Sequence, residues 1–181
     1  MEMVRNGHAV PNTPRPAAAA PLSGGGQCGG DDAESPSPLI TPTSYGGDPT
    51  GNTDSTNAMM RAMAALTNAS SHAAHPMASH IVNLGGATLD LLGGEYLISS
   101  PLIIPPHVGN VRIRGGTLRA SASFPAGRFL IEVGQAGCKP PGDNQGCCNE
   151  FVGMDNLFLD AAHVGAGAVL VQNTMGTTVG E

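Results

Sequence analysis

Between Leu84 and Ala120 the chain alternates short apolar runs with polar or turn-forming breaks. Four runs, TLDLL, YLI, PLII and VRIRGGTL, are separated by Gly-Gly, Ser-Ser and Pro-Pro. Each run is too short for a globular helix, and the Gly and Pro residues favour turns, so each run predicts a strand of only a few residues. Such strands cannot enclose a core within one turn of chain. We therefore expect successive turns to stack into a solenoid.

The pattern also repeats along the chain. GGATLDL at 85–91 is similar to GGTLRA at 115–120 and to MDNLFLDA at 154–161, which places equivalent leucines 29 and then 39 positions apart. These spacings are those of one coil and of one coil with an insertion. We therefore expect three coils, over residues 81–105, 111–133 and 151–171. Between the second and the third we expect a polar insertion, over residues 134–150.

A helix is expected just before the first coil, within YGGDPTGNTDSTNAMMRAMAAL. The glycines at its start favour a tight turn, and Asp54, Ser55 or Thr56 can cap the helix that follows. The apolar residues of that helix recur at helical spacing over about three turns. They are Met59, Ala62, Met63 and Leu66. A helix here would cover the open end of the first coil, whose strand edges would otherwise be exposed.

Composition supports a narrow β-lined interior. The chain has no Trp and only 3% aromatic residues, whereas Gly (26) and Pro (15) are abundant among its 181 residues. Small aliphatic side chains suit a column of repeated layers. Residues 1–41 are rich in Pro, Ala, Gly and Ser without periodic apolar positions, so we expect a disordered tail there. The structured part is then residues 42–181.

Charge excludes some partners and suggests another. The formal charge of −6 weighs against nucleic acid or an anionic membrane as a partner. The sequence contains no run of 18 apolar residues, so it predicts no membrane-spanning segment. Met1–Ala20 lacks the features of a secretory signal. Residues 101–140 nevertheless carry five basic residues and one acidic residue. Strand alternation directs Arg112 and Arg114 outward, where they and Arg119 either bind an anionic ligand or form a solvated outer wall.

Three cysteines lie together in the insertion: Cys138, Cys147 and Cys148. A bridge from Cys138 to Cys147 or to Cys148 would close a short loop and would imply an oxidising compartment. A zinc site is the alternative, but this spacing does not supply two CxxC pairs and no His is close. We expect the disulfide, with one cysteine of the three left over.

Two further motifs are weaker. His72, His75 and His80 could ligate a metal, but Pro76 interrupts the segment and no Cys or carboxylate lies nearby, so we expect a solvated loop. We accordingly expect neither a metal nor a cofactor. Asn68 begins an Asn-Ala-Ser glycosylation sequon, which matters only if the chain enters the secretory route.

Longer stretches resemble known proteins. YGGDPTGNTDSTNAMMRAM resembles the opening signature of pectate-lyase-type right-handed parallel β-helices, in which a Gly-Asp-x-Thr-Asp-x-Thr pattern leads into a capping helix. Residues 93–134 and 149–180 are similar to plant polygalacturonase-like proteins of the quartet type, within the pectin lyase-like superfamily. The resemblance covers about residues 42–181. It implies an all-β, right-handed parallel β-helix, of which this chain is the N-terminal part with a short capping α-helix.

The resemblance also implies an activity: hydrolysis of galacturonosyl linkages in cell-wall pectin, outside the cell. Family members invert the anomeric centre, which requires two carboxyl groups about 6.5–9.5 Å apart so that a water fits between them. The family motifs are Asn-Thr-Asp-Gly, Asp-Asp, Gly-His-Gly and Arg-x-Lys. Here Asp-Asp occurs only in the tail, Gly-His-Gly and Arg-x-Lys are absent, and Asn52-Thr53-Asp54 belongs to the cap signature. No catalytic residue of the family therefore carries over to this chain.

Three functional hypotheses remain open. In the first, the chain is the N-terminal portion of a pectin-degrading polygalacturonase-like protein, with too few coils and too few catalytic motifs to be active alone. In the second, it is a non-catalytic fragment that binds polysaccharide through Arg112, Arg114 and Arg119. In the third, it associates with itself through the open last coil. Pectic polysaccharide is the expected partner under the resemblance, and no nucleic acid or membrane is expected.

Overall fold

The computed structural model describes residues 37–69, 77, 81–134 and 148–180, which lie within one compact unit, Ser35–Glu181. Residues 1–36 of the expected tail, the three histidines at 72, 75 and 80, and two of the clustered cysteines, Cys138 and Cys147, lie outside the described residues. No helix in the described part of the chain is long and apolar enough to cross a membrane.

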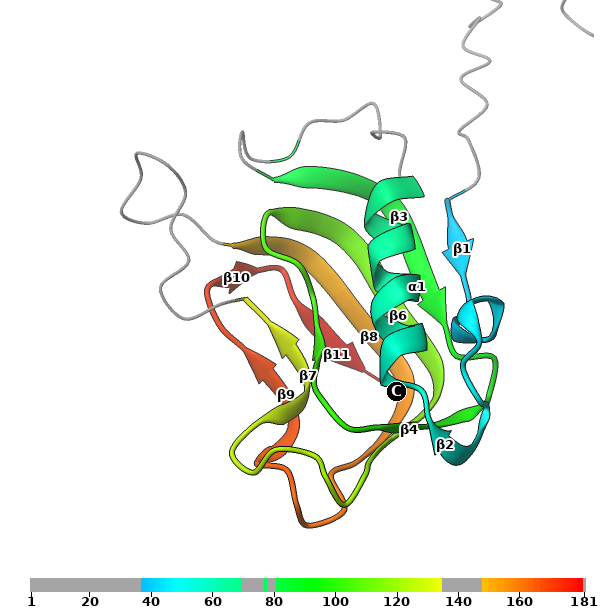
Figure 1. The fold of residues 1–181 in the computed structure, drawn as a ribbon. Helices are drawn as coiled ribbons and strands as arrows, with labels where there is room; N and C mark the ends of the chain where they lie inside the picture. Colours follow the sequence, from blue (N-terminus) through cyan, green and yellow to red (C-terminus); the bar gives the residue numbers. More distant parts are fainter. Residues whose placement is uncertain (1–36, 70–76, 78–80, 135–147, 181) are drawn as a thin grey trace, which may run out of the picture. The chain divides into compact units, whose positions relative to one another are not determined.

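The described part of the chain is mostly strand, with one α-helix and one short 3-10 helix (Figure 1). The elements before the first long strand are β1 (Leu39–Ile40), η1 (Pro42–Tyr45), β2 (Thr50–Asp54) and α1 (Thr56–Ala69). The strands that follow are β3 (Val82–Asp90), β4 (Glu95–Ile98), β5 (Leu102–Ile103), β6 (Val108–Ala120), β7 (Phe129–Val133), β8 (Asn149–Asp160), β9 (Gly167–Val171), β10 (Thr174–Met175) and β11 (Thr178–Gly180).

Every pair among the described strands is parallel. In the larger sheet β3 pairs with β6, β6 with β8, and β8 with β10 and β11. The smaller sheet has the order β5-β7-β9. Strands separated by long stretches of sequence therefore lie side by side with the same direction. The prediction of an all-β parallel fold with one helix is confirmed at this level.

The register corrects the predicted repeat. Leu89 pairs with Ile113, and Ile113 pairs with Met154, so equivalent positions lie 24 and then 41 residues apart instead of 29 and 39. The sequence alignment placed the two Gly-Gly pairs at equivalent positions, but they are not equivalent. Gly85-Gly86 precedes the paired segment 87–90, whereas Gly115-Gly116 follows the paired segment 111–114. Gly116 is needed where it is, since a Cβ there would lie 2.6 Å from the Leu91 Cβ and 2.7 Å from the Gly94 carbonyl oxygen.

Two of the strands are longer than the apolar runs predict. β6 has 13 residues and β8 has 12, because ladder pairing continues through the glycines and asparagines that were expected to end each strand. The bends occur within these strands, at residues with positive φ such as Asn110 (55°), Gly115 (73°) and Asn156 (52°). The left-handed conformation turns the backbone without ending the hydrogen-bonded ladder.

The alternation predicted for β6 is confirmed. Val111 and Ile113 are buried, and so are Leu89 and Met154, the register partners of Ile113. Arg112 and Arg114 point outward. The predicted apolar stripe of α1 is also buried and joins the same hydrophobic core. It comprises Met59, Ala62, Met63 and Leu66. The helix contacts β3 and β1 (Figure 1), so one continuous core extends from the helix into the sheet.

The N-terminal edge is paired more fully than the sequence indicated. Leu39-Ile40, which was assigned to the disordered tail, forms β1 and pairs with Thr88-Leu89 of β3. β2 similarly pairs with β4. The tail boundary at residue 41 is therefore too late. These short strands occupy backbone groups at an edge that would otherwise be open to another chain.

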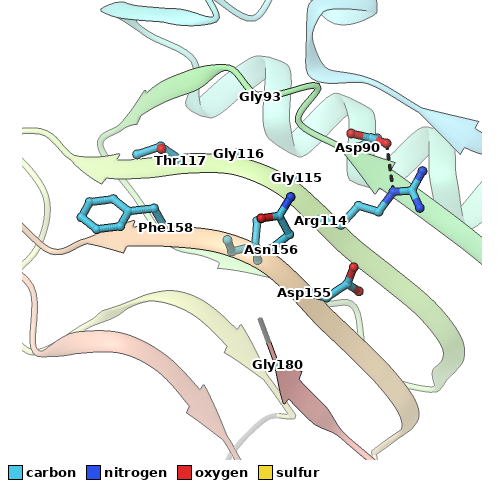
Figure 2. A pocket seen from close by; sticks show the side chains of 11 residues that line it. Asp90, Gly93, Arg114, Gly115, Gly116, Thr117, Asp155, Asn156, Phe158 and Gly180 are labelled. Atoms are coloured by element: carbon cyan, nitrogen blue, oxygen red, sulfur yellow. Dashed lines mark hydrogen bonds and ion pairs between the residues drawn. The ribbon is translucent and has the colours of Figure 1, made fainter. Parts of the chain in front are cut away.

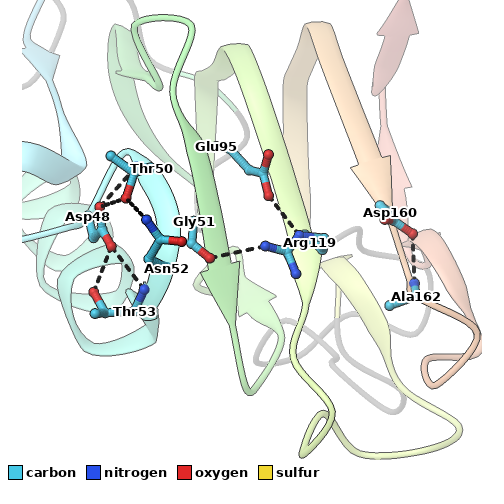
Figure 3. Close-up of polar contacts among 9 residues, drawn as sticks. All are labelled: Asp48, Thr50, Gly51, Asn52, Thr53, Glu95, Arg119, Asp160 and Ala162. Atoms are coloured by element: carbon cyan, nitrogen blue, oxygen red, sulfur yellow. Dashed lines mark hydrogen bonds and ion pairs between the residues drawn. The ribbon is translucent and has the colours of Figure 1, made fainter.

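Hydrogen bonds fix the loop that leads into α1 (Figure 3). The Asp48 carboxylate accepts from the backbone N–H and hydroxyl of Thr50, at 2.9 and 2.6 Å, and from those of Thr53, both at 2.9 Å. These donors hold the pKa of Asp48 well below its usual range. The Asp54 carboxylate accepts from the N–H and hydroxyl of Thr56, at 2.8 and 2.6 Å, and from the Ser99 hydroxyl. Asp54 thus caps the helix, as predicted, and ties it to the end of β4.

Substituting Asp54 tests this junction. Burial alone would raise the pKa of Asp54, but hydrogen bonds from Ser99 and Thr56 outweigh it and the pKa is lowered. Its stabilising contribution is therefore present above the unfolded-state pKa of about 4 and is lost as the pH falls through the lower folded-state pKa. We expect Asp54→Ala to reduce the free energy of unfolding by about 1 kcal/mol at pH 7, and by less near pH 2.

Urea denaturation at both pH values measures the difference. Asn57→Ala, at an exposed position of the same helix, is the matched control and should have little effect. An equal loss for Asp54→Ala at both pH values would show that the carboxylate charge is not what stabilises the junction.

Candidate functional site

The candidate site lies on the outer side of the larger sheet. Asp90 pairs in register with Arg114, Arg114 with Asp155, and Asp155 with Gly180, so one row crosses β3, β6, β8 and β11. Figure 2 shows these side chains along an open cleft of about 770 Å³, whose lining also includes Asn156 and Phe158. Parallel pairing thus brings together polar residues that are far apart in the sequence.

Arginine–carboxylate contacts cross this outer side. The Arg114 Nε lies 2.9 Å from Asp90 Oδ2 (Figure 2), and Asp90 Oδ1 accepts from the Leu92 N–H at 2.9 Å. The Arg112 Nε lies 3.3 Å from Asp155 Oδ1, and 54% of the Arg112 side chain is exposed. The Arg114–Asp90 contact is short, and the Leu92 N–H also holds the Asp90 carboxylate. The Arg112–Asp155 contact is longer and open to solvent.

Arg119 is held more firmly. Its Nε donates to Glu95 Oε1 at 2.7 Å and its Nη2 donates to the Gly51 carbonyl at 3.0 Å (Figure 3). Through these bonds it connects β6 with β4 and β2. Its position is outward, as predicted for the outer wall, but its guanidinium is already occupied by two partners from neighbouring layers. Arg119 therefore acts mainly as a structural connection.

A fourth pair lies on β7. Arg128 donates to Glu132 from Nε and Nη2, both at 2.7 Å, and the Phe129 N–H donates to Glu132 at 3.1 Å. The hydrogen bond from Arg128 lowers the pKa of Glu132, despite the opposing effect of burial, and the same hydrogen bond raises the pKa of Arg128. Each described arginine between 101 and 140 thus faces an acid, and the excess of positive charge seen in the sequence does not form a bare basic patch.

The pairing of these acids with arginines was not predicted from the sequence. Asp90 with Arg114 and Glu95 with Arg119 are both 24 residues apart, although only the first pair is in register, because Glu95 pairs with Thr117. The sequence contained this signal as two opposite-charge pairs at one fixed interval. It was missed because the leucine alignment had set the interval at 29.

The arrangement supplies no evident acid–base pair for hydrolysis. Asp90 and Asp155 stand on either side of β6, so their backbones are about 10 Å apart, but an arginine holds each carboxylate. A general acid must present a proton to the glycosidic oxygen, and a general base must be open to water. Asn52-Thr53-Asp54 lies in β2 and its aspartate caps α1, as the sequence suggested.

The remaining predicted residues are placed only in part. Asn68 is exposed near the end of α1, while the serine of its sequon lies outside the described residues, so glycosylation stays a prediction. Cys148 is buried and disulfide-bonded. The other cysteines lie outside the described residues, so the pairing also stays a prediction. In the part of the chain that the structure describes, no group of three or more His, Cys, Asp or Glu residues is arranged to hold a metal.

Comparison with known proteins gives one informative match. Over 137 residues the chain is 41% identical to Polygalacturonase QRT3 of Arabidopsis thaliana, and the match covers 75% of this chain and 27% of that protein. The chain therefore spans about a quarter of the length of this curated relative. No family model and no solved structure matches the chain.

The geometry of the arginines leads to a stability prediction. Exposed ion pairs contribute about 0–1 kcal/mol, and a hydrogen bond to a backbone carbonyl adds about 1 kcal/mol. We expect Arg119→Ser, which removes both, to lower the free energy of unfolding by about 1 kcal/mol or more, and Arg112→Ser to change it by less than about 0.5 kcal/mol. Urea denaturation of the two variants provides the comparison. Equal losses in the two variants would contradict the conclusion that Arg119 stabilises the fold and Arg112 does not.

Proposed function

The chain is a plant polygalacturonase-like protein, and from this we propose that it forms part of a glycoside hydrolase that acts on cell-wall pectin. The observation that carries the proposal is the 41% identity over 137 residues to Polygalacturonase QRT3. The reaction class is hydrolysis of galacturonosyl linkages, and the place of action is outside the cell. We further propose that the matched residues are the N-terminal portion of such an enzyme.

We also propose that the fold is the beginning of a right-handed parallel β-helix. Two series of strands support this proposal, since β3, β6, β8 and β11 follow one another in register, as do β5, β7 and β9. A chain that returns repeatedly to the next parallel position must coil, and parallel crossovers are right-handed in nearly all proteins. α1 would cover the first coil, because its apolar stripe shares the core of β3.

Under this proposal the chain is a scaffold that does not hydrolyse pectin by itself. Its two cleft carboxylates, Asp90 and Asp155, are held by arginines, and the family motifs that supply the acid and the base do not occur in its coils. Two suitably spaced carboxyl groups are required for inversion. The catalytic carboxylates of a working enzyme would then come from coils other than those described.

A second candidate function is polysaccharide binding without catalysis. The observation in its favour is the exposure of two phenylalanines on β8: 56% of Phe151 and 68% of Phe158 is accessible to solvent. Both line clefts that also contain arginine side chains. Aromatic rings with adjacent polar groups are suited to ligands that have both apolar and polar surfaces. This function and the first share the same partner, pectic polysaccharide, and both predict that this chain alone has no turnover.

Turnover and retention test these proposals. We expect the purified chain to be retarded on immobilised polygalacturonate relative to a neutral agarose matrix, and to release no reducing ends from soluble polygalacturonate. Saturable release of reducing ends would contradict the scaffold proposal. Elution at the same volume from both matrices would contradict pectin as the partner.

A further inference from the structure

A second cleft lies beside the first, on the same outer side of the larger sheet. Its volume is about 460 Å³, within the range of roughly 300–1,000 Å³ that is usual for small-ligand pockets. Its floor is the register row Thr88, Arg112, Gly153 and Thr178, which crosses four parallel strands. Phe151 forms part of its wall. We propose that this cleft binds one uronate residue of an acidic polysaccharide, with Phe151 against the sugar ring and Arg112 on the carboxylate.

Phe151 has an unusual backbone conformation. Its φ of 50° lies in the left-handed region, which bulky residues rarely adopt. The register places it at the bend shared with Asn110 and Gly176, where the other residues are of types that accept this conformation. Strained positions held by the surrounding structure are concentrated at functional sites. Here the bend directs a large aromatic ring to the surface, where 56% of the residue is exposed.

Glycines make room around this ring. A Cβ on Gly176 would lie 2.7 Å from Phe151 Cδ1, so a larger residue there would displace the ring. A Cβ on Gly153 would lie 3.5 Å from Arg112 Nε, an ordinary contact distance, so the floor of the cleft is open above this glycine. The result is an aromatic wall beside a floor that has little side-chain bulk at its centre.

Polar groups in the cleft match a sugar. The Thr88 hydroxyl donates to the Gly86 carbonyl at 3.0 Å, which leaves the oxygen available as an acceptor. Asn110 also lines the cleft; its amide N–H donates to Asn83 Oδ1 at 3.0 Å, which leaves its own amide oxygen able to accept. A sugar ring presents hydroxyl donors at its edge and an apolar face above it. Acceptors on the floor and an aromatic wall complement both.

Arg112 provides the selectivity for a carboxylate. Its ion pair with Asp155, at 3.3 Å, is the longest of the four described arginine–acid contacts, which otherwise range from 2.7 to 2.9 Å. Arg112 lines this cleft whereas Asp155 lines the neighbouring one. A uronate carboxylate can therefore take the place of Asp155 at Arg112, so that Arg112 keeps one carboxylate partner. Guanidinium groups bind carboxylates strongly and directionally.

This inference rests on the proposed pectin-related function and specifies the residues that would recognise the polymer. The test is calorimetric titration of the complete 181-residue chain with trigalacturonate, and with neutral galactotriose as the uncharged probe. We expect Arg112→Gln to weaken trigalacturonate binding about tenfold, as for loss of one charge-assisted hydrogen bond, while galactotriose binding is unchanged. Phe151→Ala should weaken the binding of both probes.

Two further variants separate recognition from general damage. Asp155→Asn removes the competitor for Arg112 and should leave trigalacturonate affinity equal to or above that of the wild type. Gly153→Leu fills the floor and should abolish binding. Val171→Ala is the control, because Val171 is exposed on β9 and lines neither cleft. Urea denaturation of each variant verifies that it is folded.

The outcomes distinguish this site from the broader function. If the wild-type chain binds trigalacturonate and is retained on polygalacturonate, but Arg112→Gln and Phe151→Ala bind with unchanged affinity, the cleft is not the site and the pectin-related function stands. A parallel loss of affinity in Asp155→Asn and Arg112→Gln would show that the ion pair is structural, and would also overturn the proposal. Absence of trigalacturonate binding by the wild-type chain would refute the uronate site, whether or not the chain is retained on immobilised polygalacturonate.

Discussion

Parallel pairing between layers of the chain is the constraint on which the other features depend. A strand such as β6 is bonded to β3 on one side and to β8 on the other, so its own inward and outward positions must match those of both neighbours. A slip of one residue would turn Ile113 outward and Arg112 into the core. The hydrophobic core, the bends and the polar rows therefore all follow from a single register.

The ion pairs show how this constraint shapes the surface. Residues in one row of a parallel sheet are held about 4.8 Å apart by the backbone, so charges of opposite sign in neighbouring layers meet without any loop to bring them together. Arg114 meets Asp90 in this way, and Arg119 reaches Glu95, whose register partner Thr117 lies two residues before Arg119 on β6. The surface is consequently polar and internally compensated, and it does not present the basic field that the local composition suggested.

Much of the fold could be predicted from local patterns, because those patterns are physical requirements of single elements. The helical stripe through Met59 and Leu66, the cap at Asp54 and the alternation in β6 each depend on a few neighbouring residues. The register could not be predicted in the same way, since it depends on which bends of neighbouring strands lie side by side in the sheet. Gly115 and Gly86 look alike in sequence, yet they occupy different bends.

The candidate site was predictable only in its outward arginines. Their partners were missed because the predicted interval was wrong, and Phe151 was missed because nothing local marks a phenylalanine at a left-handed bend. In a segment that looks like the start of one more apolar strand, Phe151 is exposed between buried neighbours. Its role depends on the glycine of the next layer, Gly176, which no pattern within β8 contains.

The change in spacing between layers has a broader consequence. The offset is 24 residues from β3 to β6 and 41 from β6 to β8, yet the rows on both sides of the longer connection stay aligned. The greater sequence length between β7 and β8 therefore does not disturb the pairing of these rows. Folding and surface diversification are thus largely independent in this architecture: a connection can lengthen, acquire a disulfide or carry a new group while the layers beneath it keep their positions. Such a scaffold can evolve new recognition properties by insertion, at little cost to the stability of what is already built.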